Sequence, residues 1–201
     1  MSFNGYCVTQ EQVPQHLRAN RSALTRWFGR AILNVFGWQV VGSIPNIKRV
    51  LIIVAPHTSN WDFVFAMAAV LGLNLRVRWL GKHTIFKPGV VWFMRWLGGI
   101  PTNREQPEDI VQYVANLSNR EEGVAIGLAP EGTRKKVTRW KTGFLRIAKL
   151  LDCPILLITL DFQGKNFVIG DLYQPTGDSE ADLTAIKHYY SGFQAKYPYK
   201  F

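Results

Sequence analysis

A histidine and an aspartate lie five residues apart in the segment from Pro56 to Asp62, directly after a β-branched apolar run. Across a turn of this length, the carboxylate can accept a hydrogen bond from one ring nitrogen of His57 and fix its tautomer, while the other nitrogen takes up a proton. None of the other three histidines has an aspartate at this spacing. The sequence therefore predicts a general base at His57 that Asp62 orients.

A second polar segment, Glu131-Gly132-Thr133-Arg134, follows the apolar run that ends at Leu128. Its glycine, hydroxyl and guanidinium offer backbone N–H, O–H and planar cationic donors, which are the groups that bind phosphate. Read alone, the same four residues are also typical of an ordinary polar turn. The lysines and arginines between residues 135 and 146 predict a basic rim beside this segment.

Together the two segments resemble the glycerolipid acyltransferase family, the group that contains 1-acylglycerol-3-phosphate acyltransferase. The family's first motif is His-x4-Asp and its third centres on Glu-Gly-Thr-Arg, and the 74 residues from His57 to Glu131 fit the family's spacing. Both motifs in this order are a rare coincidence in a chain of this size. The resemblance covers about residues 45–165. Within it, Arg104 matches the arginine of the second motif, and Cys153-Pro154-Ile155 resembles the fourth.

The resemblance implies transfer of a fatty acyl group from a thioester of coenzyme A or acyl carrier protein to a hydroxyl of a glycerol-phosphate-type lipid, such as 1-acylglycerol-3-phosphate, in phospholipid biosynthesis. It implies that His57 is the base and Asp62 its orienting carboxylate, with no cofactor besides the thioester and no metal. Because the residues before Arg104 depart from the family pattern, another lysolipid or a hydroxylated lipid stays open as acceptor. The residues expected to hold the acceptor head group are Arg104, Glu131, Gly132, Thr133 and Arg134, with the arginines supplying the charge and Glu131 bracing an arginine or the loop.

The elements that position these residues follow from the hydrophobic pattern. Apolar runs predict strands at 50–55, 75–80, 123–128 and 155–160 and an edge strand at 167–169. Spacings of three and four predict helices at 24–36, 61–71, 108–117, 143–151 and 181–193. This alternation predicts a single α/β domain with a mainly parallel sheet flanked by helices. Because parallel strands end at one edge of the sheet, His57 and Glu131 should open onto the same edge.

Composition narrows the class of protein. The 201 residues are 47% hydrophobic and 19% charged, which excludes a disordered or fibrous chain. A net charge of +10 with 13% aromatic residues indicates an anionic partner, either phospholipid, phosphorylated substrate or nucleic acid. The two cysteines, Cys7 and Cys153, form no CxxC pair, which argues against a disulfide scaffold or a structural zinc site. With no secretory signal and no spanning segment apparent, we expect a cytoplasmic protein, peripheral on the inner face of the cell membrane.

The predicted helix at 24–36 is a basic amphipathic helix, with Arg21, Arg26 and Arg30 on the side opposite its apolar stripe. That pattern suits a membrane surface, but it is also typical of a helix that packs on its own domain. We divide the chain accordingly into an N-terminal amphipathic helical segment, 1–44, and an acyltransferase domain, 45–201. The apolar stripe consists of Leu24, Trp27, Phe28, Ala31, Ile32, Val35 and Phe36.

Two other functions compete with acyl transfer. Because Ser59 lies two residues after His57, a serine hydrolase is the nearest enzymatic alternative. The sequence has no Gly-x-Ser-x-Gly elbow, however, and a nucleophile this close in sequence to its base would need unusual geometry. A basic chain with seven tryptophans could also bind nucleic acid. Several of these aromatics, such as Trp92, Phe93 and Trp96, lie in apolar segments and are better explained as core or lipid contacts. We therefore expect no nucleic-acid partner.

Overall fold

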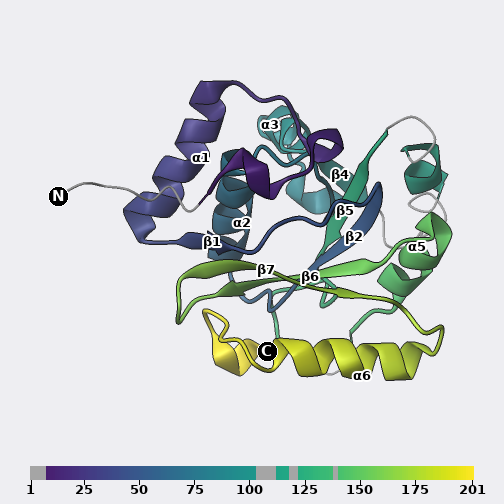
Figure 1. Cartoon of the computed structure of the whole chain (residues 1–201). Helices are drawn as coiled ribbons and strands as arrows, with labels where there is room; N and C mark the ends of the chain where they lie inside the picture. Colours follow the sequence, from purple (N-terminus) through teal and green to yellow (C-terminus); the bar gives the residue numbers. More distant parts are fainter. Residues whose placement is uncertain (1–7, 103–111, 118–121, 138–139) are drawn as a thin grey trace.

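The structure, a computed structural model, describes residues 8–102, 112–117, 122–137 and 140–201. Its centre is a seven-stranded sheet in the order β1-β7-β6-β2-β5-β3-β4 (Figure 1). All neighbouring strands run parallel except β6 and β7, which are antiparallel. This confirms the predicted α/β fold with a mainly parallel sheet. The strands are β1 Gln39–Val41, β2 Arg49–Val54, β3 Arg78–Lys82, β4 Gly99–Thr102, β5 Val124–Leu128, β6 Ile155–Asp161 and β7 Asn166–Tyr173.

Helices cover both faces of the sheet, because the central strands are apolar on both sides (Figure 1). In β2, Val50 and Ile52 pack in the same core as α1 and α2, whereas Leu51 and Ile53 pack in a second core with α5 and α6. Residues 112–117 are also helical, and Val114 belongs to the second core. The helices are α1 Ala23–Phe36, α2 Asn60–Gly72, α3 Val91–Trp96, α5 Gly143–Leu151 and α6 Ser179–Tyr190, with 3-10 turns η1 Gln10–Gln12, η2 Gln15–Leu17, η3 His83–Ile85 and η4 Pro198–Lys200.

Three predicted elements differ from the structure. The strand expected at 75–80 is β3, which spans Arg78–Lys82. The apolar residues Leu75 and Val77, which suggested an earlier start, are instead buried in the connection that follows α2. The strand at 167–169 is wrong as an edge strand, because β7 lies between β6 and β1. The closing helix begins at Ser179, where the Asp178 side chain accepts from the backbone N–H of two first-turn residues, and ends at Tyr190. Short β1 was not predicted, because a three-residue strand has no periodicity to detect.

The helix α1 packs on α2 through a glycine. A Cβ at Gly29 would lie 2.6 Å from the Ala68 carbonyl oxygen, so the two helices meet more closely there than any side chain would allow. Leu33, one turn later, is buried on the same side. Most of the predicted stripe therefore points away from α2, although the Phe36 ring lies 5.5 Å from the rings of Trp61 and Phe65 on α2. Its largest members are 42% to 80% exposed: Leu24, Trp27, Phe28, Val35 and Phe36.

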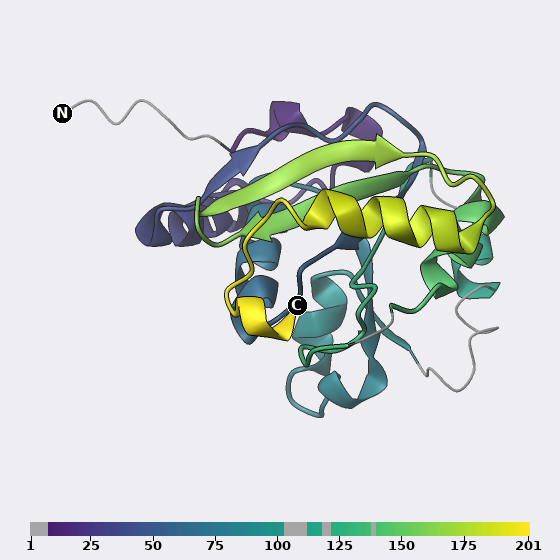
Figure 2. The same ribbon diagram turned by 90° about the horizontal axis from the view of Figure 1, so that it is seen from below.

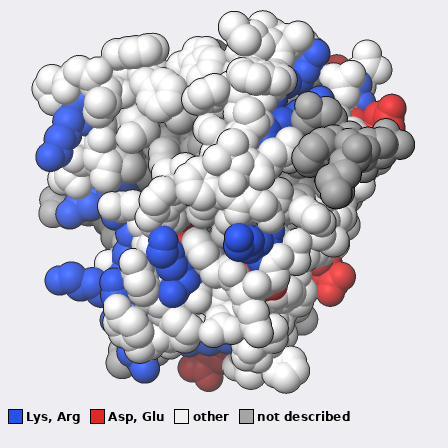
Figure 3. All heavy atoms as spheres, turned by 90° about the vertical axis from the view of Figure 1, so that its left-hand side faces the viewer, with Lys and Arg blue, Asp and Glu red and all other residues white. Residues whose placement is uncertain are grey.

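The interpretation that this stripe packs on the domain is thus wrong for most of it, namely the exposed Leu24, Trp27, Phe28 and Val35, whereas Ile32 and Phe36 do contact the domain. The arginines, which we placed opposite the stripe, bind the protein backbone. Arg30 donates to the Gly72 carbonyl at 3.2 Å and Arg21 to the Leu75 carbonyl at 2.7 Å, near the C-terminus of α2 where the helix dipole favours positive charge. Figure 3, which views this side of the molecule, shows mainly uncharged atoms over its upper half, where α1 lies.

Candidate active site

The loop after β2 brings His57 and Asp62 into contact. His57 Nδ1 lies 3.1 Å from Asp62 Oδ2, and Asp62 is buried while the His57 ring is partly open to solvent. Contact at Nδ1 leaves Nε2, on the far side of the ring, as the nitrogen able to accept a proton from a bound hydroxyl. This is the arrangement that the five-residue spacing predicted.

Asp62 is fixed by the start of α2 as well as by the histidine. Its Oδ2 accepts the backbone N–H groups of Thr58 and Ser59, both at 2.7 Å, and its Oδ1 accepts the Ser59 hydroxyl at 2.9 Å. The same Ser59 oxygen accepts the N–H of Trp61 and caps the helix. Ser59 is thus a buried capping residue bonded to a carboxylate, which argues against a role as the nucleophile of a hydrolase.

The third motif meets the first through Glu131. Since β2 and β5 are adjacent and parallel, with Ile53 opposite Leu128, the loops that follow them leave the sheet side by side. The Glu131 carboxyl accepts the backbone N–H of His57, at 2.8 Å to Oε2 and 3.1 Å to Oε1. Sequence reasoning expected Glu131 to brace an arginine or the loop, and in the structure it braces the backbone of His57 in the first-motif loop.

The Glu131 carboxyl is deeply buried, with only 5% of the residue exposed. Burial raises the pKa of Glu131 to about 8; the hydrogen bond from His57 opposes this shift, and the charge of Asp62 adds to it. The carboxyl is therefore mainly protonated at neutral pH.

Of the other residues predicted to bind the acceptor, the structure describes Gly132, Thr133 and Arg134, which lie in the loop after β5. Gly132 has a φ of +68°, a conformation that favours glycine, and the Thr133 hydroxyl accepts the N–H of Lys135 at 3.3 Å. The exposed Arg134 guanidinium donates to the side-chain oxygen of Asn60, in the first turn of α2. This contact places Arg134 at the start of the helix that carries Asp62. Arg104 lies outside the described residues.

A family model described as Acyltransferase matches residues 11–160, about three quarters of the chain. The chain belongs to the acyltransferase family. A 1-acyl-sn-glycerol-3-phosphate acyltransferase of Streptococcus pneumoniae is 26% identical over an alignment of 140 residues, which covers 65% of this chain and 52% of the relative. The chain thus spans about half the length of that curated relative.

The fold is also shared with a solved member of this group. The crystal structure of the 1-acyl-sn-glycerophosphate acyltransferase PlsC from Thermotoga maritima superposes with a TM-score of 0.59. The match covers 87% of this chain and 80% of the other, at 19% identity. This likeness establishes that the mainly parallel sheet flanked by helices is shared.

Sequence reasoning missed the C-terminal segment, residues 191–201, which lies against the first motif (Figure 2). The backbone N–H of Tyr197 donates to the Thr58 hydroxyl at 3.3 Å. The Lys196 ammonium lies 4.8 Å from the centre of the Trp61 ring. The only sequence signal was the cluster of aromatic and basic residues at 196–201, which does not indicate where the segment packs.

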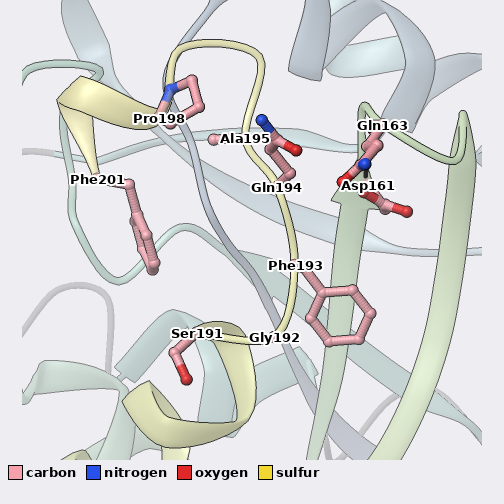
Figure 4. A pocket seen from close by; sticks show the side chains of 9 residues that line it. All are labelled: Asp161, Gln163, Ser191, Gly192, Phe193, Gln194, Ala195, Pro198 and Phe201. Atoms are coloured by element: carbon pink, nitrogen blue, oxygen red, sulfur yellow. Dashed lines mark hydrogen bonds between the residues drawn. The ribbon is translucent and has the colours of Figure 1, made fainter.

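A cavity of about 400 Å³ lies under the same segment but contains no residue of either motif (Figure 4). Its single carboxylate, Asp161, accepts the backbone N–H groups of Gln163 and Gly164 and so closes the turn between β6 and β7. The cavity is therefore a gap between this turn and the C-terminal segment. It is lined by Asp161, Gln163, Ser191, Gly192, Phe193, Gln194, Ala195, Pro198 and Phe201.

Within the described ranges, no three His, Cys, Asp or Glu side chains gather where they could hold a metal ion. Among the helices of these same ranges, none has the length and apolar character needed to span a membrane.

Proposed function

We propose that this protein transfers a fatty acyl group from an acyl thioester to the hydroxyl of 1-acylglycerol 3-phosphate or a closely related lysolipid. The observation that carries the proposal is the contact of His57 with buried Asp62, in a loop whose backbone is held by Glu131. The activity named for the pneumococcal relative supports the same acceptor. The donor is a thioester of coenzyme A or acyl carrier protein, and the product belongs to phospholipid biosynthesis.

In the proposed reaction, Nε2 of His57 removes the proton of the acceptor hydroxyl as its oxygen attacks the thioester carbonyl. The tetrahedral intermediate then expels the thiolate, which takes the same proton from the imidazolium and leaves as a thiol. Asp62 stabilises the imidazolium and prevents the ring from turning. Because a thioester is already activated, holding donor, acceptor and base together accounts for much of the acceleration without a cofactor.

We propose that Arg134 binds the phosphate of the acceptor, together with Gly132, Thr133 and Arg104. Support comes from the exposed position of the Arg134 guanidinium beside the start of α2. A planar guanidinium can grip two phosphate oxygens, and lysine cannot copy that geometry. Arg134→Lys should therefore raise the KM for the acceptor about tenfold and leave the KM for the donor nearly unchanged. The opposite pattern would assign the basic loop to the donor.

We further propose that the exposed stripe of α1 docks on the cytoplasmic face of the membrane, where the lipid acceptor resides. The stripe reaches the site, because the Phe36 ring lies 5.5 Å from the ring of Trp61, which follows the catalytic loop. Since Arg21 and Arg30 bind backbone carbonyls, the apolar side chains provide most of the attraction.

Vesicle sedimentation tests this docking. A protein with Trp27→Glu and Phe28→Glu should lose binding to vesicles that contain anionic lipid, while its folded signal in circular dichroism is retained. A protein with Glu at the exposed positions Lys149 and Leu150, on α5, is the matched control. Equal binding by both variants would move the membrane contact to another surface.

The catalytic proposal is tested by thiol release from acyl-CoA with a panel of lysolipids. His57→Ala should abolish acyl transfer to the best acceptor, because it removes the group proposed to take the hydroxyl proton. His188→Ala, on α6, is a matched control that should keep wild-type turnover. A folded His57→Ala protein with near wild-type activity would show that His57 is not the base.

A further inference from the structure

A second, smaller cavity adjoins the catalytic loop on the side of the C-terminal segment. Its volume is about 160 Å³, which is several times the roughly 30 Å³ that a water molecule occupies in the liquid. Glu131 is part of its wall, and the same Glu131 holds the backbone of His57. The cavity is lined by Glu131, Val137, Trp140, Lys187, Lys200 and Phe201.

The two lysines in this wall come from different elements, which the fold brings together. Lys187 lies in the last turn of α6, a helix anchored by the hydrogen bond from the Tyr190 hydroxyl to the Ile53 carbonyl at 2.8 Å. Lys200 lies in η4, in the C-terminal segment that Tyr197 ties to the first motif. The Phe201 ring, next to Lys200, packs 6.1 Å from the ring of Trp140. Both lysines are therefore held at the cavity by contacts of their own elements.

Neither lysine has a carboxylate within 4.0 Å among the described residues. Their ammonium groups lie instead over aromatic rings, that of Lys187 at 5.7 Å from Trp140 and that of Lys200 at 4.5 Å from Tyr197. The carboxyl that shares the cavity, Glu131, is mainly protonated at neutral pH because burial raises its pKa. The cavity thus concentrates positive charge that no acidic side chain in the described residues offsets.

We infer that Lys187 and Lys200 bind a phosphate group of a substrate in this cavity. A phosphate monoester carries close to two negative charges at neutral pH and has three acceptor oxygens. Two ammonium groups match that charge and donate to those oxygens. The position of Glu131 between the cavity and the His57 backbone would keep the bound phosphate close to the catalytic loop. This inference rests on the proposed acyl transfer only for the identity of the substrate, because a phosphate would bind whether or not turnover occurs.

Two substrates could supply the phosphate. One is the acceptor, whose phosphate lies a few bonds from the reacting hydroxyl. The other is the donor, since coenzyme A and the prosthetic group of acyl carrier protein both carry phosphate. Because Arg134 is proposed to bind the acceptor phosphate, the donor is the expected occupant, and binding of the acceptor here would mean that the two lysines share that phosphate with Arg134.

Isothermal calorimetry on the full chain separates these cases with paired ligands. Glycerol 3-phosphate is compared with glycerol, and coenzyme A with pantetheine, which lacks the phosphates. Lys187→Gln with Lys200→Gln should weaken binding of one phosphate ligand about tenfold or more, because charge-assisted hydrogen bonds are lost. Lys48→Gln with Lys149→Gln, which removes two exposed lysines outside the cavity, should leave both affinities unchanged.

A loss confined to glycerol 3-phosphate assigns the cavity to the acceptor, and a loss confined to coenzyme A assigns it to the donor. Lys200→Arg keeps the charge and should retain most of the affinity, which controls for a merely structural effect. Unchanged affinities in the Lys187 and Lys200 variant would overturn the inference. So would a wild-type protein that binds the phosphate ligands no better than glycerol and pantetheine. Because binding is measured directly, absence of acyl transfer would count against the proposed function alone.

Discussion

The buried Glu131 carboxyl should make the protein less stable as the pH rises through the neutral range. In the folded protein its pKa is about 8, raised by burial from an ordinary value of 4.5 that applies to the unfolded chain. Between these two values the native state holds a proton that the unfolded state has lost. Rising pH then favours unfolding, so the stability due to this group is complete below pH 4.5 and is lost as the pH passes through about 8.

The size of the effect follows from that interval. One proton difference changes the free energy of unfolding by about 1.4 kcal/mol for each pH unit. Over the roughly 3.5 pH units from 4.5 to about 8, the total is about 5 kcal/mol, an upper figure because water and side chains rearrange around a buried charge. Glu131→Gln removes the ionisation but keeps an oxygen that can accept the His57 N–H.

Urea unfolding between pH 5 and pH 8 measures this contribution. The free energy of unfolding of the wild type, minus that of Glu131→Gln, should fall by several kcal/mol across the range. Taking this difference cancels the titration of other groups. Glu122→Gln, at an exposed carboxylate, is the matched control and should follow the wild type within about 0.5 kcal/mol. A difference between wild type and Glu131→Gln that stays constant with pH would refute the reasoning, since the carboxyl would then ionise alike in both states.

Three further changes test other contacts. Asp62→Asn should lower acyl transfer at least 100-fold, because the amide no longer stabilises the His57 imidazolium, and steady-state kinetics measures this loss. It should also lower the free energy of unfolding by about 1–3 kcal/mol, measured by urea unfolding, because the amide cannot accept every hydrogen bond that the carboxylate accepts. Tyr190→Phe should cost about 1 kcal/mol, measured by urea unfolding, because it removes the buried hydrogen bond to the Ile53 carbonyl; no loss would mean that this hydroxyl contributes nothing net. Gly29→Ala should lower the free energy of unfolding by about 1–3 kcal/mol, because its Cβ would press into the backbone of α2, and an unchanged melting temperature would show that α1 packs differently.

For α1, the hydrophobic pattern predicts the apolar stripe but does not show which side of the helix packs on the domain. The spacing of apolar residues from Leu24 to Phe36 predicted the helix within one residue of its observed start. The side that packs on α2 is decided by Gly29 and Leu33, since only a residue without a side chain allows the two backbones to approach. A glycine that lowers helix propensity in the sequence is, in the fold, the contact that orients the helix.

At the candidate site, the position of Glu131 could be predicted from the sequence, but its binding partner and its pKa could not. That both motifs lie at the ends of buried strands could be predicted, because runs such as 50–55 and 123–128 are apolar at every position. Which atom Glu131 binds depends on strand order, and β2 and β5 are neighbours although two other strands separate them along the chain. The raised pKa of Glu131 also exists only once the fold has buried the carboxyl.

The sequence by itself determined the chemistry of the candidate site, because the residue types and the spacing from His57 to Asp62 are local and the turn between them is short. The tertiary structure alone decided what surrounds that chemistry. Tyr197 is 139 residues beyond Thr58, yet the two are hydrogen bonded. Lys187 and Lys200 likewise share a cavity with Glu131, although more than 50 residues separate them from it in the sequence. Contacts across such distances depend on how whole elements pack, and no local periodicity records that packing.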